Sequence, residues 1–273
     1  MSDALETEFL DRLHTDLQHD RLVLPTLPEM ALHIRDIVSD ANCSLANVAR
    51  CVIRDPALSA RIIQIANSPL LRARSPIESV EMAVMRMGGA MIKNVVTAVV
   101  MEQLFQATND VTERKLRSAW QHASEVSSLA VVISYQHPHL QADQAMLAGL
   151  VHDIGILPIL TLAEEYPLLL KDEKRMDRLV EQAHTRIGKA LLMHWNFPEA
   201  LVNVAAEHEN LQYQTEGKAD YVDLVIAANL QSTRNTSRCK SQGDLSAIPA
   251  FARLGLGSCI EVVEMEAVAV AYS

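Results

Sequence analysis

The chain has 273 residues, of which 49% are hydrophobic and 4% aromatic, and its formal net charge is −10. This length allows one large helical domain or two smaller ones, and the apolar content excludes wholesale disorder. The negative charge argues against general binding to nucleic acid or to anionic membranes, because both need clustered Lys and Arg side chains.

The sequence carries no signal that we associate with export or membrane insertion. Its first residues, MSDALETEFLDRLHTDL, are acidic and lack the apolar stretch of a signal peptide. No run approaches the roughly 18 consecutive apolar residues of a membrane span. The cysteines show no CxxC pairing, so we expect reduced thiols and a cytoplasmic protein. These cysteines are Cys43, Cys51, Cys239 and Cys259.

The first part of the chain predicts about five short helices. Their apolar residues recur at helical spacing, and prolines and potential N-cap residues separate one helix from the next. A pair of glycines divides the last of them from a longer apolar helix that ends near residue 105. The expected boundaries lie at Pro25, Pro28, Ser44, Asp55, Pro56, Pro69 and Gly88–Gly89.

The second part of the chain predicts longer helices after a polar stretch at residues 106–118. Scarce glycine and few aromatic residues also favour helices packed on helices. We therefore expect an all-α protein with two subdomains, residues 1–110 and residues 111–273. The helices of the second subdomain are expected over 118–136, 145–160, 176–195, 199–209 and 219–233, followed by a loop at 235–244 and a last helix within 249–273.

The strongest local signal for chemistry is the pair His152 and Asp153, within LAGLVHDIGIL. Adjacent side chains lie about 100° apart on a helix, so both can reach one metal only near a cleft or a helix end. The apolar neighbours and Gly155 indicate a buried helix, and a buried aspartate needs a partner. The pair alone leaves two interpretations open, a metal site or a hydrogen-bonded structural pair.

Three further histidines, His122, His184 and His208, lie within apolar helical patterns. Helical bundles hold metals with imidazole and carboxylate ligands that come from several helices, so these histidines favour the metal site. By contrast, His194 lies beside Trp195, and we expect it to pack at a helix end.

Nucleic acid is not an expected partner. The helices expected over 45–53 and 57–66 superficially suggest a helix-turn-helix. However, the second of them offers only Arg61 and Gln64 as base-reading side chains, and its apolar positions indicate burial.

Several motifs of the chain, in the same order, resemble those of the HDOD (HD-related output domain) family. The resemblance covers roughly residues 20–260. It implies an HD-like helical bundle packed against an N-terminal helical bundle, and a regulatory role in bacterial signalling. The motifs are LPTLPEM, VIRDPALSARIIQIANSP, IESVEMAVMRMGG, AWQHASEVSSLA, AGLVHDIGIL, EQAHTRIGKALLMHWNFPEALV, AAEHE and VIAANL.

HDOD domains in turn resemble the HD phosphohydrolases and the HD-GYP phosphodiesterases. His152 and Asp153 match the HD pair of that superfamily, and His122 matches its first histidine. His184 and His208 resemble later histidines of the HD-GYP pattern. The resemblance implies a divalent metal (Fe, Mn or Zn), and the ligands it implies are His122, His152, Asp153, His184 and His208.

Three positions depart from the HD-GYP pattern. Ile156 stands where those enzymes have a lysine, Glu207 replaces the first histidine of the HHE motif, and Asn229 replaces the closing aspartate. The GYP loop is absent as well. A neutral amide weakens metal binding, and without the lysine a phosphate loses a neutralising cation.

We therefore predict a non-catalytic signalling module that acts through a signalling protein or a nucleotide-like ligand. The alternative is an active metal-dependent phosphohydrolase with an atypical HD site. The oligomeric state stays open, because apolar helix faces serve cores and interfaces equally well.

Overall fold

Helices make up the regular secondary structure in the part of the chain that the structure describes. The computed structural model describes residues 2–19, 21–22, 25, 28–39, 44–68, 76–107, 109–232 and 245–256. No strand occurs within these ranges, which confirms the expected all-α fold class. The predicted loop at 235–244 and most of the last predicted helix lie outside the described residues, as do Cys43, Cys239 and Cys259.

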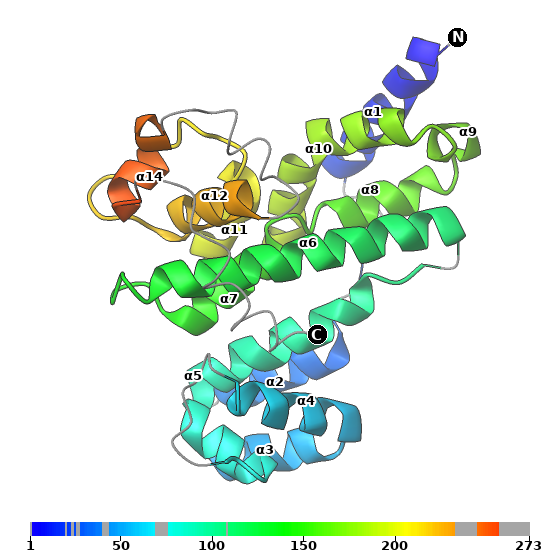
Figure 1. Ribbon diagram of the computed structural model, residues 1–273. Helices are drawn as coiled ribbons and strands as arrows, with labels where there is room; N and C mark the ends of the chain where they lie inside the picture. The colour runs from blue at the N-terminus through cyan, green and yellow to red at the C-terminus, as the bar shows by residue number, and fades with distance from the viewer. Residues whose placement is uncertain are drawn as a thin grey trace.

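One group of helices, in the lower part of Figure 1, is arranged around α5, which contacts the other three. Two of the predicted N-caps are confirmed. Ser44 Oγ accepts a hydrogen bond from Asn47 N at 3.3 Å, and Asp55 Oδ1 accepts from Ala57 N and Leu58 N at 3.0 Å. The group consists of α2 (Glu29–Ser39), α3 (Leu45–Ile53), α4 (Pro56–Ala66) and α5 (Val80–Met101), which the short η1 (Glu102–Leu104) extends.

The predicted break at Gly88–Gly89 appears as a kink inside α5. Gly88 has φ 73° and ψ 174°, a conformation that side chains with a Cβ rarely adopt. Glycine at this position therefore lets the helix change direction without ending.

The second group of helices, in the upper part of Figure 1, contains the two long helices α6 and α10. Helix α6 begins earlier than predicted, at Asp110, because Asn109 Oδ1 caps it by accepting from Val111 N at 2.9 Å. The group consists of α6 (Asp110–Ser134), α7 (Ala142–Val151), α8 (Ile156–Ala163), α9 (Pro167–Leu170), α10 (Glu173–His194), α11 (Glu199–Glu207), α12 (Tyr221–Gln231), η3 (Leu245–Ala247) and α14 (Pro249–Leu254).

Helix α1 (Ser2–Gln18) packs on this second group, against α8 and α10 (Figure 1). Its Phe9 and Leu13 are fully buried, and Arg175 of α10 pairs with Glu6 at 2.7 Å. The first helix of the chain thus lies against residues of the range 111–273. The division at residue 110 stays a prediction.

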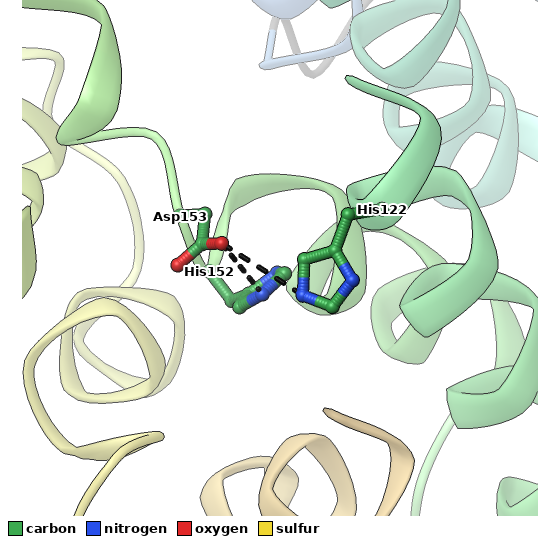
Figure 2. Close-up of side chains that lie close together, drawn as sticks. All are labelled: His122, His152 and Asp153. Atoms are coloured by element: carbon green, nitrogen blue, oxygen red, sulfur yellow. Dashed lines mark ion pairs between the residues drawn. The ribbon is translucent and has the colours of Figure 1, made fainter. Parts of the chain in front are cut away.

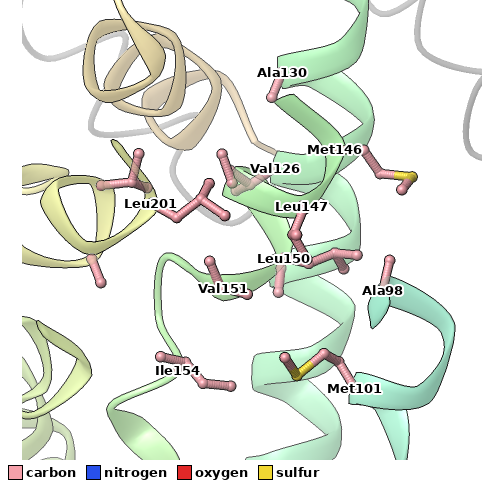
Figure 3. Packing of buried hydrophobic residues seen from close by; sticks show 14 of the residues in the cluster. Ala98, Met101, Val126, Ala130, Met146, Leu147, Leu150, Val151, Ile154 and Leu201 are labelled. Atoms are coloured by element: carbon pink, nitrogen blue, oxygen red, sulfur yellow. The ribbon is translucent and has the colours of Figure 1, made fainter. Parts of the chain in front are cut away.

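The two groups meet where α5 packs against α7. Every residue of α7 from Ala145 to Val151 is buried, so the joint between the groups is part of the core. A polar contact adds to it, since Asn94 donates to Asp143 Oδ2 at 2.7 Å. Figure 3 shows the apolar part, with Ala98, Met101, Val126, Ala130, Met146, Leu147, Leu150, Val151, Ile154 and Leu201 labelled.

The helix predicted over residues 145–160 is in fact two helices. Helix α7 ends at Val151 and α8 begins at Ile156. Between them the backbone forms tighter bonds, from Ile154 N to Val151 O and from Leu157 N to Ile154 O, both 3.2 Å. Such tightening within a helical stretch is common at functional sites. Here it places the HD pair at a helix end, as a shared metal site requires.

Two glycines, Gly149 in α7 and Gly155 in the turn after it, allow this part of the chain to lie directly on neighbouring backbones. A Cβ at Gly155 would lie 2.0 Å from the carbonyl oxygen of His184 and 2.5 Å from Gly188 N, both in α10. A Cβ at Gly149 would lie 2.4 Å from Ser127 Cα, in α6. Because these contacts involve backbone, no side-chain rearrangement could make room for a larger residue.

Two stretches, Val80–Leu104 and Ala142–Ala163, are long and apolar enough to cross a membrane, contrary to the sequence-based expectation. Of their most apolar windows, 50% and 83% are buried inside the protein. Core helices of soluble proteins have the same properties, so this finding is weak evidence for a span. The absence of a membrane partner stays a prediction.

We predict that Gly155→Ala lowers the free energy of unfolding by about 3 kcal/mol, because the new methyl group overlaps the backbone of α10. Urea denaturation measures the change. Gly89→Ala is the matched control, since its Cβ would meet only Val38 Cγ1 at 3.6 Å and Leu45 Cδ2 at 4.0 Å. Equal stability of the two variants would contradict the tight crossing.

Candidate metal centre

The structure brings the five predicted ligands together around the carboxylate of Asp153. Oδ2 lies 3.3 Å from His152 Nε2 and 3.8 Å from His122 Nε2, as Figure 2 shows. Oδ1 lies 3.2 Å from His208 Nε2 and 3.4 Å from His184 Nε2. Four imidazoles therefore direct the same ring nitrogen at one carboxylate.

Five different segments supply these side chains. His122 lies in α6 and His184 in α10, while His152 and His208 are the C-cap residues of α7 and α11. Asp153 lies in the turn between α7 and α8. The four histidines are buried, and the Asp153 side chain is 15% exposed, so the centre is reached from solvent on the side of this carboxylate.

Backbone carbonyls fix the orientation of three of the rings. In each case Nδ1 lies within hydrogen-bond distance of a carbonyl oxygen in the preceding turn. An Nδ1 that donates to a carbonyl leaves Nε2 as the unprotonated nitrogen, which is the form that binds metals. We assign this tautomer from the hydrogen bonds. They join His152 to Gly149 (2.7 Å), His184 to Val180 (2.9 Å) and His208 to Val204 (3.1 Å).

The fourth ring has a different partner. Nδ1 of His122 lies 3.5 Å from the hydroxyl oxygen of Ser232, which is itself buried. Ser232 follows α12, so residues at the end of that helix also help to orient the ligand set.

Two observations test whether these residues fit a metal ion. Nε2 of His184 and Nε2 of His208 are 3.2 Å apart, so two unprotonated nitrogens face each other, an arrangement that a proton or a metal ion between them would relieve. Nε2 of His152 is buried without a well-aligned hydrogen-bond partner. Donors of this type suit Fe, Mn or Zn. The residues fit a divalent metal.

Asp153 takes part in both possible groups of ligands. One combines it with His122 and His152, the other with His184 and His208, and the ligand atoms of each group lie within 4.8 Å of one another. Burial raises the pKa of Asp153, but the charge and hydrogen bonds that His152 and His208 would supply with a proton on Nε2 lower it, and the net shift takes this pKa well below its ordinary value. The carboxylate is therefore ionised at neutral pH and available to a cation.

A cleft of about 660 Å³ opens from the centre to solvent between α6 and α10. Asp153, His122 and His184 form its inner end. The other lining residues are Val111, Arg114, Lys115, Ser118, Ala119, Ile156, Leu160, Glu173, Asp177, Val180, Glu181, Glu209 and Asn229. Arg114 and Lys115 were not among the predicted site residues, although their spacing from His122 places them on the same face of α6.

Of the three departures from the HD-GYP pattern, Ile156 and Asn229 line the cleft and Glu207 does not. Ile156 places an apolar side chain at the position where the HD-GYP enzymes have a lysine. Glu207 accepts a hydrogen bond from Asn210 at 2.9 Å and is not part of the cleft wall. Asn229 lines the cleft and donates through Nδ2 to Glu209 Oε1 at 3.1 Å. An amide at this position therefore binds a carboxylate that an aspartate would repel.

We predict that Asn229→Asp lowers the free energy of unfolding of the metal-free protein by about 2 kcal/mol, because a buried carboxylate would face Glu209. Adding Glu209→Gln should restore most of that loss, since the glutamine can donate to the new carboxylate. Urea denaturation in the presence of a chelator compares the two variants. A single variant as stable as the parent protein would contradict the Asn229–Glu209 contact.

Comparison with solved structures supports the fold. A "Putative metal-dependent phosphohydrolase" from Shewanella amazonensis SB2B is similar over 100% of both chains, with 31% sequence identity and a TM-score of 0.86. An "HDOD domain protein with unknown function" from Geobacter sulfurreducens is 24% identical over 90% of this chain and 88% of its own, with a TM-score of 0.63. The second likeness shows the fold alone.

A curated relative, an "Uncharacterized protein" of Treponema pallidum (strain Nichols), is 25% identical over 222 residues. The match includes 76% of this chain and 42% of the relative, so this chain spans less than half the length of that protein. The sequence model of the HDOD domain family matches residues 24–211, well over half of the chain, which confirms the resemblance found in the sequence. This chain belongs to the HDOD family.

Proposed function

We propose that this protein is a regulatory HDOD module whose HD-type centre binds a divalent metal ion, Fe, Mn or Zn, and whose cleft receives a small anionic ligand such as a nucleotide. The observation that carries the proposal is the convergence of four imidazoles and Asp153 at the inner end of a solvent-filled cleft. The membership of the HDOD family supports the regulatory role. The other partner that we propose is a signalling protein.

A bound metal would be held by Asp153 and by histidines of the four that surround it, and it would polarise an oxygen of an anionic ligand. The chain itself orients that ligand through the walls of the cleft and holds the imidazoles in place through their backbone hydrogen bonds. Among the described residues, Cys51 is a buried cysteine that forms no disulfide bond. A reduced thiol agrees with the cytoplasm, which we propose as the compartment of the protein.

Binding without cleavage agrees with the residues next to the centre. Ile156 offers no charge to a phosphate, and the amide of Asn229 is engaged with Glu209. The cations of the cleft, Arg114 and Lys115, lie in the first two turns of α6, whereas His122 lies further along it. A phosphoryl group at the centre would therefore have no side-chain cation beside the metal to stabilise the charge of its transition state.

A metal-dependent phosphohydrolase is the second candidate function. A specific observation favours it, because Glu209 provides a carboxylate in the cleft that could accept a proton from a water molecule. The description of the Shewanella amazonensis structure names the same activity.

We predict that protein purified without chelator and then incubated with Mn(II), Fe(II) or Zn(II) retains at least about one equivalent of metal, with a rise in Tm of about 5 °C. His152→Ala and His208→Ala should lose both effects. Elemental analysis and thermal denaturation measure them. The matched control is His194→Ala, which removes an exposed histidine of α10 away from the centre and should change neither. No retained metal in the parent protein would refute the proposed function.

We predict that the metal-loaded protein cleaves bis(p-nitrophenyl) phosphate no faster than its His152→Ala variant, because Ile156 provides no side-chain cation to act beside the metal on a phosphoryl group. Release of nitrophenolate, followed by absorbance, measures the rate. A metal-dependent rate that disappears in His152→Ala would instead establish the phosphohydrolase.

A further inference from the structure

One wall of the cleft is a single face of α6. The lining residues of this helix are spaced by three or four positions, which places them on one side of it. The face ends at a metal ligand, His122, and carries two cations near its beginning. Its residues are Val111, Arg114, Lys115, Ser118, Ala119 and His122.

The opposite wall is a face of α10 with acidic side chains. Glu173, Asp177 and Glu181 lie on it, and His184 forms its inner end. The walls are bridged at the mouth of the cleft, where Lys115 Nζ donates to Asp177 Oδ1 at 2.7 Å. The Asp177 side chain is 68% exposed, so this ion pair contributes little to stability and is easily exchanged for another partner.

Carboxylates outnumber cations in the cleft by five to two. Two of them are engaged with neutral groups at the inner end, since Asp153 faces the four histidines and Glu209 accepts from Asn229. Without a bound cation the cleft repels anions. An anionic ligand therefore requires the metal, and the two cations of α6 are the other groups of the lining that can attract it.

The cations lie at a defined separation from the centre. Lys115 precedes His122 by seven positions, which corresponds to about 10 Å along the helix axis. Side chains lean towards the N-terminus of their helix, so Lys115 and the exposed Arg114 reach towards the mouth and away from the metal ligands. A single phosphate at the centre would not contact them.

We propose that Arg114 and Lys115 bind the second anionic group of an elongated ligand whose first anionic group lies at the metal centre. The ligand class is an organic bisphosphate with its phosphate groups about 10 Å apart. Asp177 holds Lys115 in the free protein and gives it up when the ligand binds. The inference rests on the proposed metal binding and adds to it the length and charge pattern of the ligand.

The test uses isothermal titration of the metal-loaded protein with hexamethylene bisphosphate, two phosphate monoesters joined by a six-carbon chain, and with inorganic phosphate. Arg114→Ala and Lys115→Ala should each weaken bisphosphate binding about fivefold. Asp177→Asn should strengthen it about threefold, because it releases Lys115. Binding of inorganic phosphate should be the same in all three variants.

Arg117→Ala is the matched control. Arg117 is a cation of the same helix, but it pairs with Glu113 at 2.9 Å, is 70% exposed and is not part of the cleft wall. Its removal should leave bisphosphate binding unchanged. Metal content and Tm of every variant, equal to those of the parent protein, establish that the centre and the fold are intact.

The outcomes separate this inference from the proposed function. If the metal is retained but Arg114→Ala and Lys115→Ala do not weaken bisphosphate binding, or Asp177→Asn weakens it, the inference is wrong and metal binding stands. The same conclusion follows if the metal-loaded parent protein gives no heat with the bisphosphate. If no metal is retained, the proposed function itself fails.

Discussion

The contact between the backbone of Gly155 and the backbone of α10 determines the geometry of the whole centre. Because no side chain separates the two segments at Gly155 and Gly188, the turn after α7 lies directly on the helix that carries His184. Gly149, within α7, allows that helix to approach α6, which carries His122. The HD pair is thereby held between two histidine-bearing helices, and the spacing of the imidazoles follows from the packing of main chains.

This packing imposes an electrostatic cost that a proton or a bound metal ion would relieve. Asp153 is an ionised carboxylate among four buried imidazoles, and two imidazole nitrogens, in His184 and His208, face each other at 3.2 Å. Buried polar groups without matching partners destabilise a fold, because each has lost its hydration. A divalent ion would satisfy Asp153 and the histidines of the ligand group that holds it, either His122 and His152 or His184 and His208. This electrostatic cost is the physical reason for proposing a metal ion at the centre.

The sequence predicted the helix starts, and which histidines lie around Asp153, better than it predicted how the helices pack. Ser44 and Asp55 mark helix ends through local chemistry, so their pattern is visible in the sequence. The tight turn between Val151 and Ile156 was missed because apolar residues continue through it, and the periodicity alone resembles one helix. The packing of α1 on α10, and the pairing of Lys115 with Asp177, depend on contacts between distant segments that spacing does not encode.

A regulatory role requires that a ligand at the centre affect a distant surface, and α7 provides a physical connection. This helix ends at His152, and its buried face packs against α5, the central helix of the other group (Figure 3). A close-packed core deforms little, so a displacement of the turn after α7 would move α7 as a body against α5. Coupling between sites travels through contiguous contacts of this kind. The metal centre and the joint between the two groups thus share one helix. We therefore expect ligand binding at the centre to shift the position of α5 and the helices packed around it.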